Sequence, residues 1–284
     1  MRIPLVSLLL LLISSVSIGQ TRGPENGSLV IVGGGMRDLD ILREFAELAG
    51  GSDAPVVVIP TAGGSEYYDE FWQGLNQFRA AGLTKLKLIH TYERAEADTA
   101  AFAQAIREAK GVWFTGGRQW RLADSYLHTE VHDALQELLE RGGVIGGSSA
   151  GATILGSYLA RGDTTSNTVM MGDHEEGFGF ISNIAIDQHL LRRNRQFDLL
   201  EITSAKPELL GIGLDEDTAI VVRNNRFEVI GNSYVVIYDN MRQIDSGGPF
   251  YFLEPGDQYD FLERQAYRPS RSLEPLERIV ETGQ

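Results

Sequence analysis

One short segment, Gly147 to Gly151, constrains this chain more than any other. Its sequence, Gly-Ser-Ser-Ala-Gly, follows a short apolar run bounded by glycines, which predicts a buried strand. It precedes an apolar stretch from Ala152 that predicts a helix. A sharp turn from strand to helix with a serine at the corner is typical of the nucleophile elbow, Gly-x-Ser-x-Gly. The alternative is a glycine-rich loop that only turns the chain.

The spacing of the glycines selects between the two serines. Glycines flank Ser149 on both sides, at Gly147 and Gly151, whereas Ser148 would have Ala150 in place of the second glycine. Neighbouring side chains would collide at so tight a corner, so small residues are required there. The following helix would also direct its N-terminus at Ser149 and favour negative charge. We therefore predict Ser149 as the nucleophile and the amide of Ala150 as an oxyanion donor.

The composition excludes several kinds of partner and site. A formal net charge of -14, with no basic patch, argues against nucleic-acid binding. The chain has no cysteine, so neither a disulfide nor a lipidated N-terminal cysteine is available. His128 and His132 stand one helical turn apart, but no third ligand has comparable spacing, which favours a solvated helix face. We predict no metal and no cofactor.

Residues 1–19 have the pattern of a secretory signal peptide. A positively charged start precedes an apolar run from 5 to 13, and Ser17 and Gly19 occupy the two positions that a signal peptidase recognises. The run is too short for a comfortable membrane span, although a retained anchor is the alternative. We expect a mature chain that begins near Gln20, is secreted or periplasmic, and has no stable membrane association.

Apolar strands alternate with helical patterns through the first half of the chain. Strands are expected at 28–32, 55–60, 85–89, 111–115 and directly before Ser149, and helices at 38–48, 70–81, 99–110 and 122–140. Right-handed crossovers of this length predict an α/β fold, a three-layer sandwich with a mostly parallel central sheet and helices on both faces. The Gly33–Gly35 turn lacks the dinucleotide-binding spacing, because Asp38 stands where the last glycine should be, so close packing of strand and helix is expected.

The pattern changes after the elbow. A polar loop is expected over 161–176, a strand over 181–186 and a helix over about 190–200. Short strands at 210–214, 218–222, 227–230 and 234–238 predict an antiparallel extension of the same sheet. Nothing in the sequence separates two domains, so residues 20–284 are expected to form a single domain.

A serine nucleophile needs a base, and histidine is the usual one near neutral pH. His189 is the best candidate, because it directly follows a strand that would end at the same edge of the sheet as Ser149. The other histidines are His90, His128, His132 and His174.

Five motifs in a fixed order resemble the cyanophycinase and dipeptidase E family of serine peptidases, peptidase family S51. The resemblance covers about residues 28–240 and implies a class I glutamine amidotransferase-like, flavodoxin-like fold with serine in place of cysteine. The motifs are Val-Gly-Gly-Gly at 32–35, Phe-Thr-Gly-Gly at 114–117 with Gln119, the elbow, Asp-Gln-His at 187–189, and Gly-Ile-Gly-Leu-Asp-Glu-Asp-Thr-Ala at 211–219.

The resemblance implies a role for each matching position. Ser149 corresponds to the nucleophile and His189 to the general base, while Gly117 and Ala150 would form the oxyanion hole. The positions that correspond to substrate-binding groups are Gln119, Asp187, Arg193 and Arg195. The alternative for the two arginines is that they are solvated or paired with neighbouring aspartates.

Two positions depart from the family pattern. The acidic residue that should orient the histidine falls near Asn167, so Asp163, Glu176 and Glu216 are further candidates for the third member of a triad. Glu216 could equally be a solvated turn carboxylate. In addition, an arginine expected three residues after Arg195 is Asp198 here, which leaves open whether cyanophycin is the substrate.

These observations predict a secreted, cyanophycinase-like serine peptidase. It would hydrolyse a short or isopeptide-linked, β-aspartyl-type substrate through an acyl-enzyme on Ser149, as an exopeptidase or isopeptidase. The alternative is a catalytically impaired binding protein that keeps the pocket, and a carboxylate within reach of His189 would discriminate between them. The absent cysteine and the export signal argue against an amidotransferase module. The sequence leaves open whether the chain is a monomer or a homodimer.

Overall fold

The computed structural model describes residues 21–242 and 248–269. The predicted signal peptide at 1–19 lies outside these residues, so it stays a prediction. Within the described part of the chain, no helix has the length and the apolar character needed to cross a membrane.

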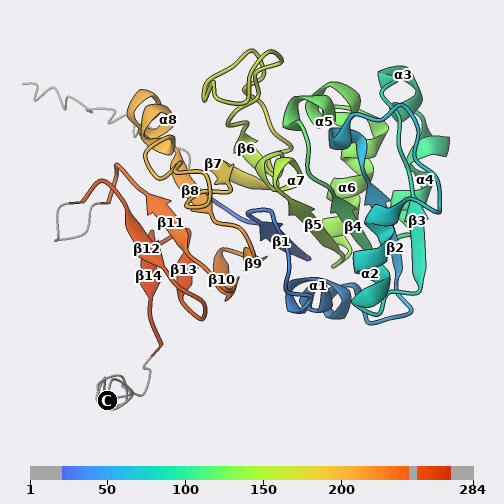
Figure 1. Ribbon diagram of the computed structural model, residues 1–284, viewed down its shortest axis with the longest axis horizontal. Helices are drawn as coiled ribbons and strands as arrows, with labels where there is room; N and C mark the ends of the chain where they lie inside the picture. The colour runs from blue at the N-terminus through green and yellow to red at the C-terminus, as the bar shows by residue number, and fades with distance from the viewer. Residues whose placement is uncertain (1–20, 243–247, 270–284) are drawn as a thin grey trace, which may run out of the picture.

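A mixed sheet forms the centre of the fold, as Figure 1 shows. Among the described residues it has nine strands in the order β14-β13-β10-β9-β1-β5-β4-β2-β3. The strands from β1 to β3 in this order are parallel, and those from β9 outwards are antiparallel. The nine are β1 (Ser28–Val32), β2 (Pro55–Ile59), β3 (Lys85–Leu88), β4 (Gly111–Phe114), β5 (Val144–Ser148), β9 (Thr218–Arg223), β10 (Arg226–Gly231), β13 (Gln258–Asp260) and β14 (Gln265–Tyr267).

Helices cover both faces of this sheet, because its parallel strands are apolar on both sides. Val30 and Val32 of β1 pack in one core with Phe45 of α1, whereas Leu29 and Ile31 belong to a second core on the opposite face. The helices are α1 (Asp40–Ala49), α2 (Asn76–Ala80), α3 (Arg94–Ala97), α4 (Ala100–Glu108), α5 (Gln119–Tyr126), α6 (Glu130–Glu140), α7 (Ala150–Thr153) and α8 (Leu199–Ala205), with 3-10 turns η1 (Thr61–Gly63) and η2 (Gln73–Leu75).

A second sheet packs against the second core and carries α8 on its outer face. In the described part of the chain it has five strands in the order β12-β11-β8-β7-β6. Strands β6, β7 and β8 are parallel to one another. The strands are β6 (Gly156–Tyr158), β7 (Ile181–Gln188), β8 (Leu210–Leu214), β11 (Val235–Tyr238) and β12 (Tyr251–Leu253).

The α/β fold with a parallel core and antiparallel C-terminal strands is confirmed, but the sheet arrangement is not as expected. The strands after residue 210 do not all extend one sheet: β9 and β10 join the central sheet, whereas β8 and β11 belong to the second. The apolar pattern of a strand does not specify its neighbour, so the sequence could not distinguish the two arrangements.

Four predicted helices were wrong in extent. The helix after the elbow ends at Thr153, because the chain from Gly156 pairs with β7 as a strand. The helix predicted over 122–140 is two helices, separated where His128 adopts a left-handed backbone with φ 56°. The segment after His189 is a series of turns up to Asp198, since the Asp215 carboxylate accepts the amides of residues 191 and 192. The helix predicted over 70–81 begins only at residue 76.

Candidate active site

Ser149 lies at the corner between β5 and α7 with a strained backbone, φ 58° and ψ -115°. Both flanking positions require glycine, because any side chain there would collide with the backbone. A Cβ on Gly147 would lie 2.0 Å from the carbonyl oxygen of Gly151, and a Cβ on Gly151 would lie 2.2 Å from that of Phe114. The two glycines therefore make the corner possible, as the spacing predicted.

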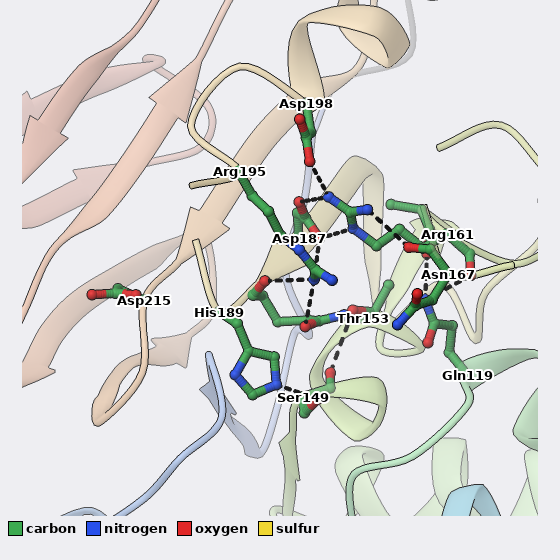
Figure 2. A network of polar contacts seen from close by, with 12 residues as sticks. Gln119, Ser149, Thr153, Arg161, Asn167, Asp187, His189, Arg195, Asp198 and Asp215 are labelled. Carbon is green, nitrogen blue, oxygen red and sulfur yellow. Dashed lines mark hydrogen bonds and ion pairs between the residues drawn. The ribbon is translucent and has the colours of Figure 1, made fainter. Parts of the chain in front are cut away.

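His189 directly follows β7, and its ring contacts the serine, as Figure 2 shows. Ser149 Oγ lies 2.8 Å from His189 Nε2. We expected the strand before His189 to lie in the same sheet as the strand before Ser149. It belongs to the second sheet instead. The two sheets meet at the end of β1, where the His189 amide donates to the carbonyl of Gly33 over 2.8 Å and the Ser149 amide donates to that of Val32 over 3.0 Å.

Glu216 is the carboxylate that the structure places beside the histidine. Its Oε1 lies 2.7 Å from His189 Nδ1, on the side of the ring opposite Ser149. Strands β7 and β8 are parallel with Gln188 opposite Leu214, so the residues just after each strand come together at one edge. Because a carboxylate only accepts hydrogen bonds, Nδ1 carries the proton and Nε2 is free to accept one from the serine.

The other three candidates for this position have partners elsewhere in the described chain. Glu176 pairs with His128 Nε2 at 2.9 Å and is exposed. Asp163 accepts hydrogen bonds from the amides of Thr165 and Ser166 in its own loop. Asn167 accepts a hydrogen bond from Arg161 at its backbone carbonyl, and the two ring nitrogens of His189 lie against Ser149 and Glu216 instead.

Burial lowers the pKa of His189 below its ordinary value of 6.5. The neighbouring Glu216 opposes this change, and the positive charge of Arg193 adds to it. Only 9% of the His189 side chain is exposed. The imidazole is therefore neutral at neutral pH, which is the state that a general base requires.

The glycines at 33–35 have a function beyond the packing of strand and helix that we expected. Gly34 has φ 108°, and a Cβ on it would lie 2.3 Å from Cε1 of His189. A Cβ on Gly35 would lie 2.5 Å from a carboxylate oxygen of Glu216. Because these glycines lack side chains, they leave room for the histidine and the glutamate. The spacing of the glycines in the sequence did not indicate this function.

The predicted oxyanion donors, Gly117 and Ala150, belong to segments that adjoin the serine. Ala150 is the first residue of α7, and the first amides of a helix have no partner within it. A Cβ on Gly116, next to Gly117, would lie 3.2 Å from Cβ of Ser149, which places this glycine turn beside the nucleophile. Gly117 has φ 146°, and a Cβ there would lie 1.9 Å from the carbonyl oxygen of Ala62, so only glycine fits.

The predicted substrate-binding residues differ in accessibility. Arg193 is exposed and lies with Arg195 in a cleft of about 470 Å³. Arg195 is buried and donates to the backbone and side-chain oxygens of Gln188 over 3.1 Å. Gln119 is 2% exposed, and its amide nitrogen donates to the carbonyls of residues 160 and 161. Asp187 is fully buried, and its role in substrate binding stays a prediction.

Arg161 is the buried partner of Asp187 and was not predicted from the sequence. Its guanidinium donates to both carboxylate oxygens of Asp187, at 2.7 and 3.0 Å, and also pairs with Asp198 (Figure 2). A single arginine in a polar loop has no pattern that would reveal such a network.

The two histidines considered for a metal have other partners. His132 is buried, and its Nε2 lies 2.9 Å from the carbonyl oxygen of Phe178, so the pair does not form the solvated face that we expected. Among the described residues, no group of three or more histidine or acidic side chains is arranged to hold a metal ion.

Comparisons with known proteins identify the family of the chain. The model of peptidase family S51 matches residues 29–230. A cyanophycinase from Geminocystis herdmanii is 32% identical over 226 residues, which cover 75% of this chain and 80% of the relative. A cyanophycinase from Synechococcus elongatus is 29% identical over 85% of this chain and 81% of its own.

Two solved structures have a similar fold. A peptidase from an acI-B1 actinobacterium superposes with a TM-score of 0.64 and 28% identity, covering 84% of this chain and 98% of that one. A putative peptidase E protein from Listeria monocytogenes superposes with a TM-score of 0.53 at 18% identity, covering 73% and 99%. The sequence and the fold thus agree that this chain is a cyanophycinase-like serine peptidase and belongs to peptidase family S51.

Proposed function

We propose that the chain hydrolyses a short or isopeptide-linked substrate of the β-aspartyl type through an acyl-enzyme on Ser149. The observation that carries the proposal is the continuous line of hydrogen bonds from Ser149 Oγ through His189 to Glu216, at 2.8 and 2.7 Å. Nucleophile, base and orienting carboxylate within this reach are the arrangement that activates a serine. The alternative, an impaired binding protein, requires that this acid be missing, so the presence of Glu216 favours the enzyme.

The proposed reaction has two halves. Ser149 Oγ attacks the substrate carbonyl carbon while His189 Nε2 takes the hydroxyl proton, and the oxyanion lies against the amides of Gly117 and Ala150. The C–N bond then breaks, and His189 returns the proton to the leaving amine. A water then attacks the acyl carbon while His189 takes its proton. The bond between that carbon and Ser149 Oγ breaks, His189 returns the proton to Oγ, and the acid product leaves.

The substrate class rests on the relatives and on the cleft. The matched relatives are cyanophycinases, and the cleft presents Arg193 and Arg195, which suit a substrate carboxylate. The test is to compare β-aspartyl-leucine with α-aspartyl-leucine, using Ser149→Ala as the blank. Release of leucine from the β-linked dipeptide alone is expected. Equal rates on both dipeptides would contradict the linkage preference.

The pH dependence follows from the neutral state of His189. Protonation removes the base, so kcat/KM should fall as the pH drops through the lowered pKa of His189, below 6.5. Arg193→Ala removes a positive charge that lowers this pKa, so the acidic limb should move to higher pH. The measurement is the pH profile of kcat/KM at low ionic strength, where the effect of an exposed charge is greatest.

The matched control is Arg223→Ala, which removes an exposed arginine paired with Glu44. This variant should leave the limb in place. A limb that moves in neither variant would contradict the electrostatic role assigned to Arg193.

We also propose that the chain is exported and cleaved near Gln20. The proposal is supported by the charged start, the apolar run and the small residues Ser17 and Gly19. N-terminal sequencing of the protein recovered outside the cytoplasm should begin close to Gln20. A mature protein that still begins at Met1 would contradict cleavage and favour the retained anchor.

A further inference from the structure

The buried ion pair of Arg161 lies in the wall of the proposed substrate cleft. Only 2% of the Arg161 side chain is exposed, and none of that of Asp187. Arg161 Nε and Nη2 bind both oxygens of Asp187, and Nη1 donates to the backbone carbonyl of Asn167 over 2.9 Å. Removing one partner of such a pair would leave an uncompensated buried charge.

The same guanidinium also engages Asp198, which lies on the turn before α8 and is partly exposed. Arg161, Asp198, Arg193 and Arg195 all line the cleft of about 470 Å³. Asp187 and Asp198 are carboxylates suited to bind a substrate guanidinium, because a carboxylate can accept two parallel hydrogen bonds from it. Here Arg161 already binds both oxygens of Asp187 and one oxygen of Asp198.

The cleft side chains that remain available to pair with a substrate are therefore mainly positively charged. Arg195 is hydrogen-bonded to the neutral side chain of Gln188 and lies 3.9 Å from the already paired Asp187. Arg193 is exposed. Glu201, the remaining acidic residue of the cleft, is exposed on α8, where water screens its charge. A carboxylate fits this surface, whereas an arginine side chain would meet Arg161.

We propose that Arg161 is a specificity-determining residue. It fills the acceptor site for a guanidinium, so that the chain binds the carboxylate of an aspartyl substrate and does not depend on an arginine side chain. This inference rests on the proposed function. The substrate class is then β-aspartyl peptides in general, with no requirement for β-aspartyl-arginine.

The test compares two dipeptides that differ only in charge, β-aspartyl-arginine and β-aspartyl-citrulline, in which a neutral ureido group replaces the guanidinium. The wild-type chain should hydrolyse them with kcat/KM values within about 3-fold of each other. A cleft that used a carboxylate to bind the guanidinium would prefer the arginine dipeptide by about 10-fold or more, and that result would overturn the proposal.

Arg161→Met frees Asp187 and Asp198 and should shift the ratio toward the arginine dipeptide by at least about 10-fold. Arg161→Lys is the matched control, because it keeps a cation between the carboxylates and should leave the ratio near its wild-type value. Guanidinium ion should bind the Arg161→Met protein, raise its melting temperature and inhibit hydrolysis of the arginine dipeptide. If the ratio of kcat/KM values for the two dipeptides is unchanged in Arg161→Met, the proposal is contradicted. If this variant does not fold, the ratio measured for the wild-type protein tests the proposal by itself.

Calorimetric binding of both dipeptides to Ser149→Ala separates this inference from the proposed function. If the wild-type protein cleaves neither dipeptide but Ser149→Ala binds both with similar affinity, the proposed hydrolytic function is wrong. The role assigned to Arg161 in the cleft is then supported. Tighter binding of the arginine dipeptide by about 10-fold would overturn the inference alone. Binding of neither dipeptide would contradict both.

Discussion

Ser149→Ala is expected to lower kcat/KM by about 10⁴-fold or more, because the acyl-enzyme cannot form without the hydroxyl. The fold should survive, since alanine adopts the φ of 58° no less readily than serine and the amide can still donate to Val32. The measurement is hydrolysis of a β-aspartyl dipeptide, with the melting temperature as the check on folding.

Ser148→Ala is the matched control. Ser148 is the last residue of β5 and is not hydrogen-bonded to His189, so its replacement should change the activity by no more than about 3-fold, as expected for a residue outside the reacting groups. An inactive Ser148→Ala with an active Ser149→Ala would contradict the register set by Gly147 and Gly151.

Glu216→Gln is expected to lower kcat by about 10⁴-fold, with little change in stability. The amide has nearly the shape of the carboxylate, but its nitrogen can donate to Nδ1 of His189 and so favour the tautomer that carries the proton on Nε2. That tautomer cannot accept the proton of Ser149. The measurement is single-turnover hydrolysis, which reports the chemical step.

Two other substitutions serve as controls for this result. Glu176→Gln and Asp163→Asn change carboxylates that pair with His128 and with their own loop, so both variants should keep most of the activity. A larger loss in either of these than in Glu216→Gln would show that Glu216 is not the orienting acid.

Much of the central geometry could be predicted because it depends on local sequence. The Gly147–Gly151 spacing identifies Ser149, since a Cβ at either glycine would collide with backbone. His189 could be selected because it directly follows an apolar strand. That strand, however, lies in the second sheet, and His189 comes to Ser149 because its amide donates to the carbonyl of Gly33 at the end of β1.

The orienting acid could not be selected from the sequence, because its position depends on a long-range strand pairing. Glu216 is brought to His189 by the parallel pairing of β7 and β8. Before that pairing is known, a glutamate after a strand looks like any exposed carboxylate of a turn. The same holds for Arg161, whose partners Asp187 and Asp198 lie far along the chain.

The helices that the sequence misplaced show the same limit. Apolar spacing after the elbow fits a helix, but residues 156–158 form β6 and pair in parallel with β7. Such competition between local pattern and sheet pairing is decided by tertiary contacts, which a single sequence does not contain.

The most direct test of the account is covalent labelling with a fluorophosphonate, followed by mass spectrometry of the proteolysed protein. One phosphonylated residue, Ser149, is expected, with labelling abolished in Ser149→Ala and strongly slowed in Glu216→Gln. A label on Ser148, or an unlabelled but folded wild-type protein that hydrolyses its substrate, would contradict the assignment of Ser149 as an activated nucleophile.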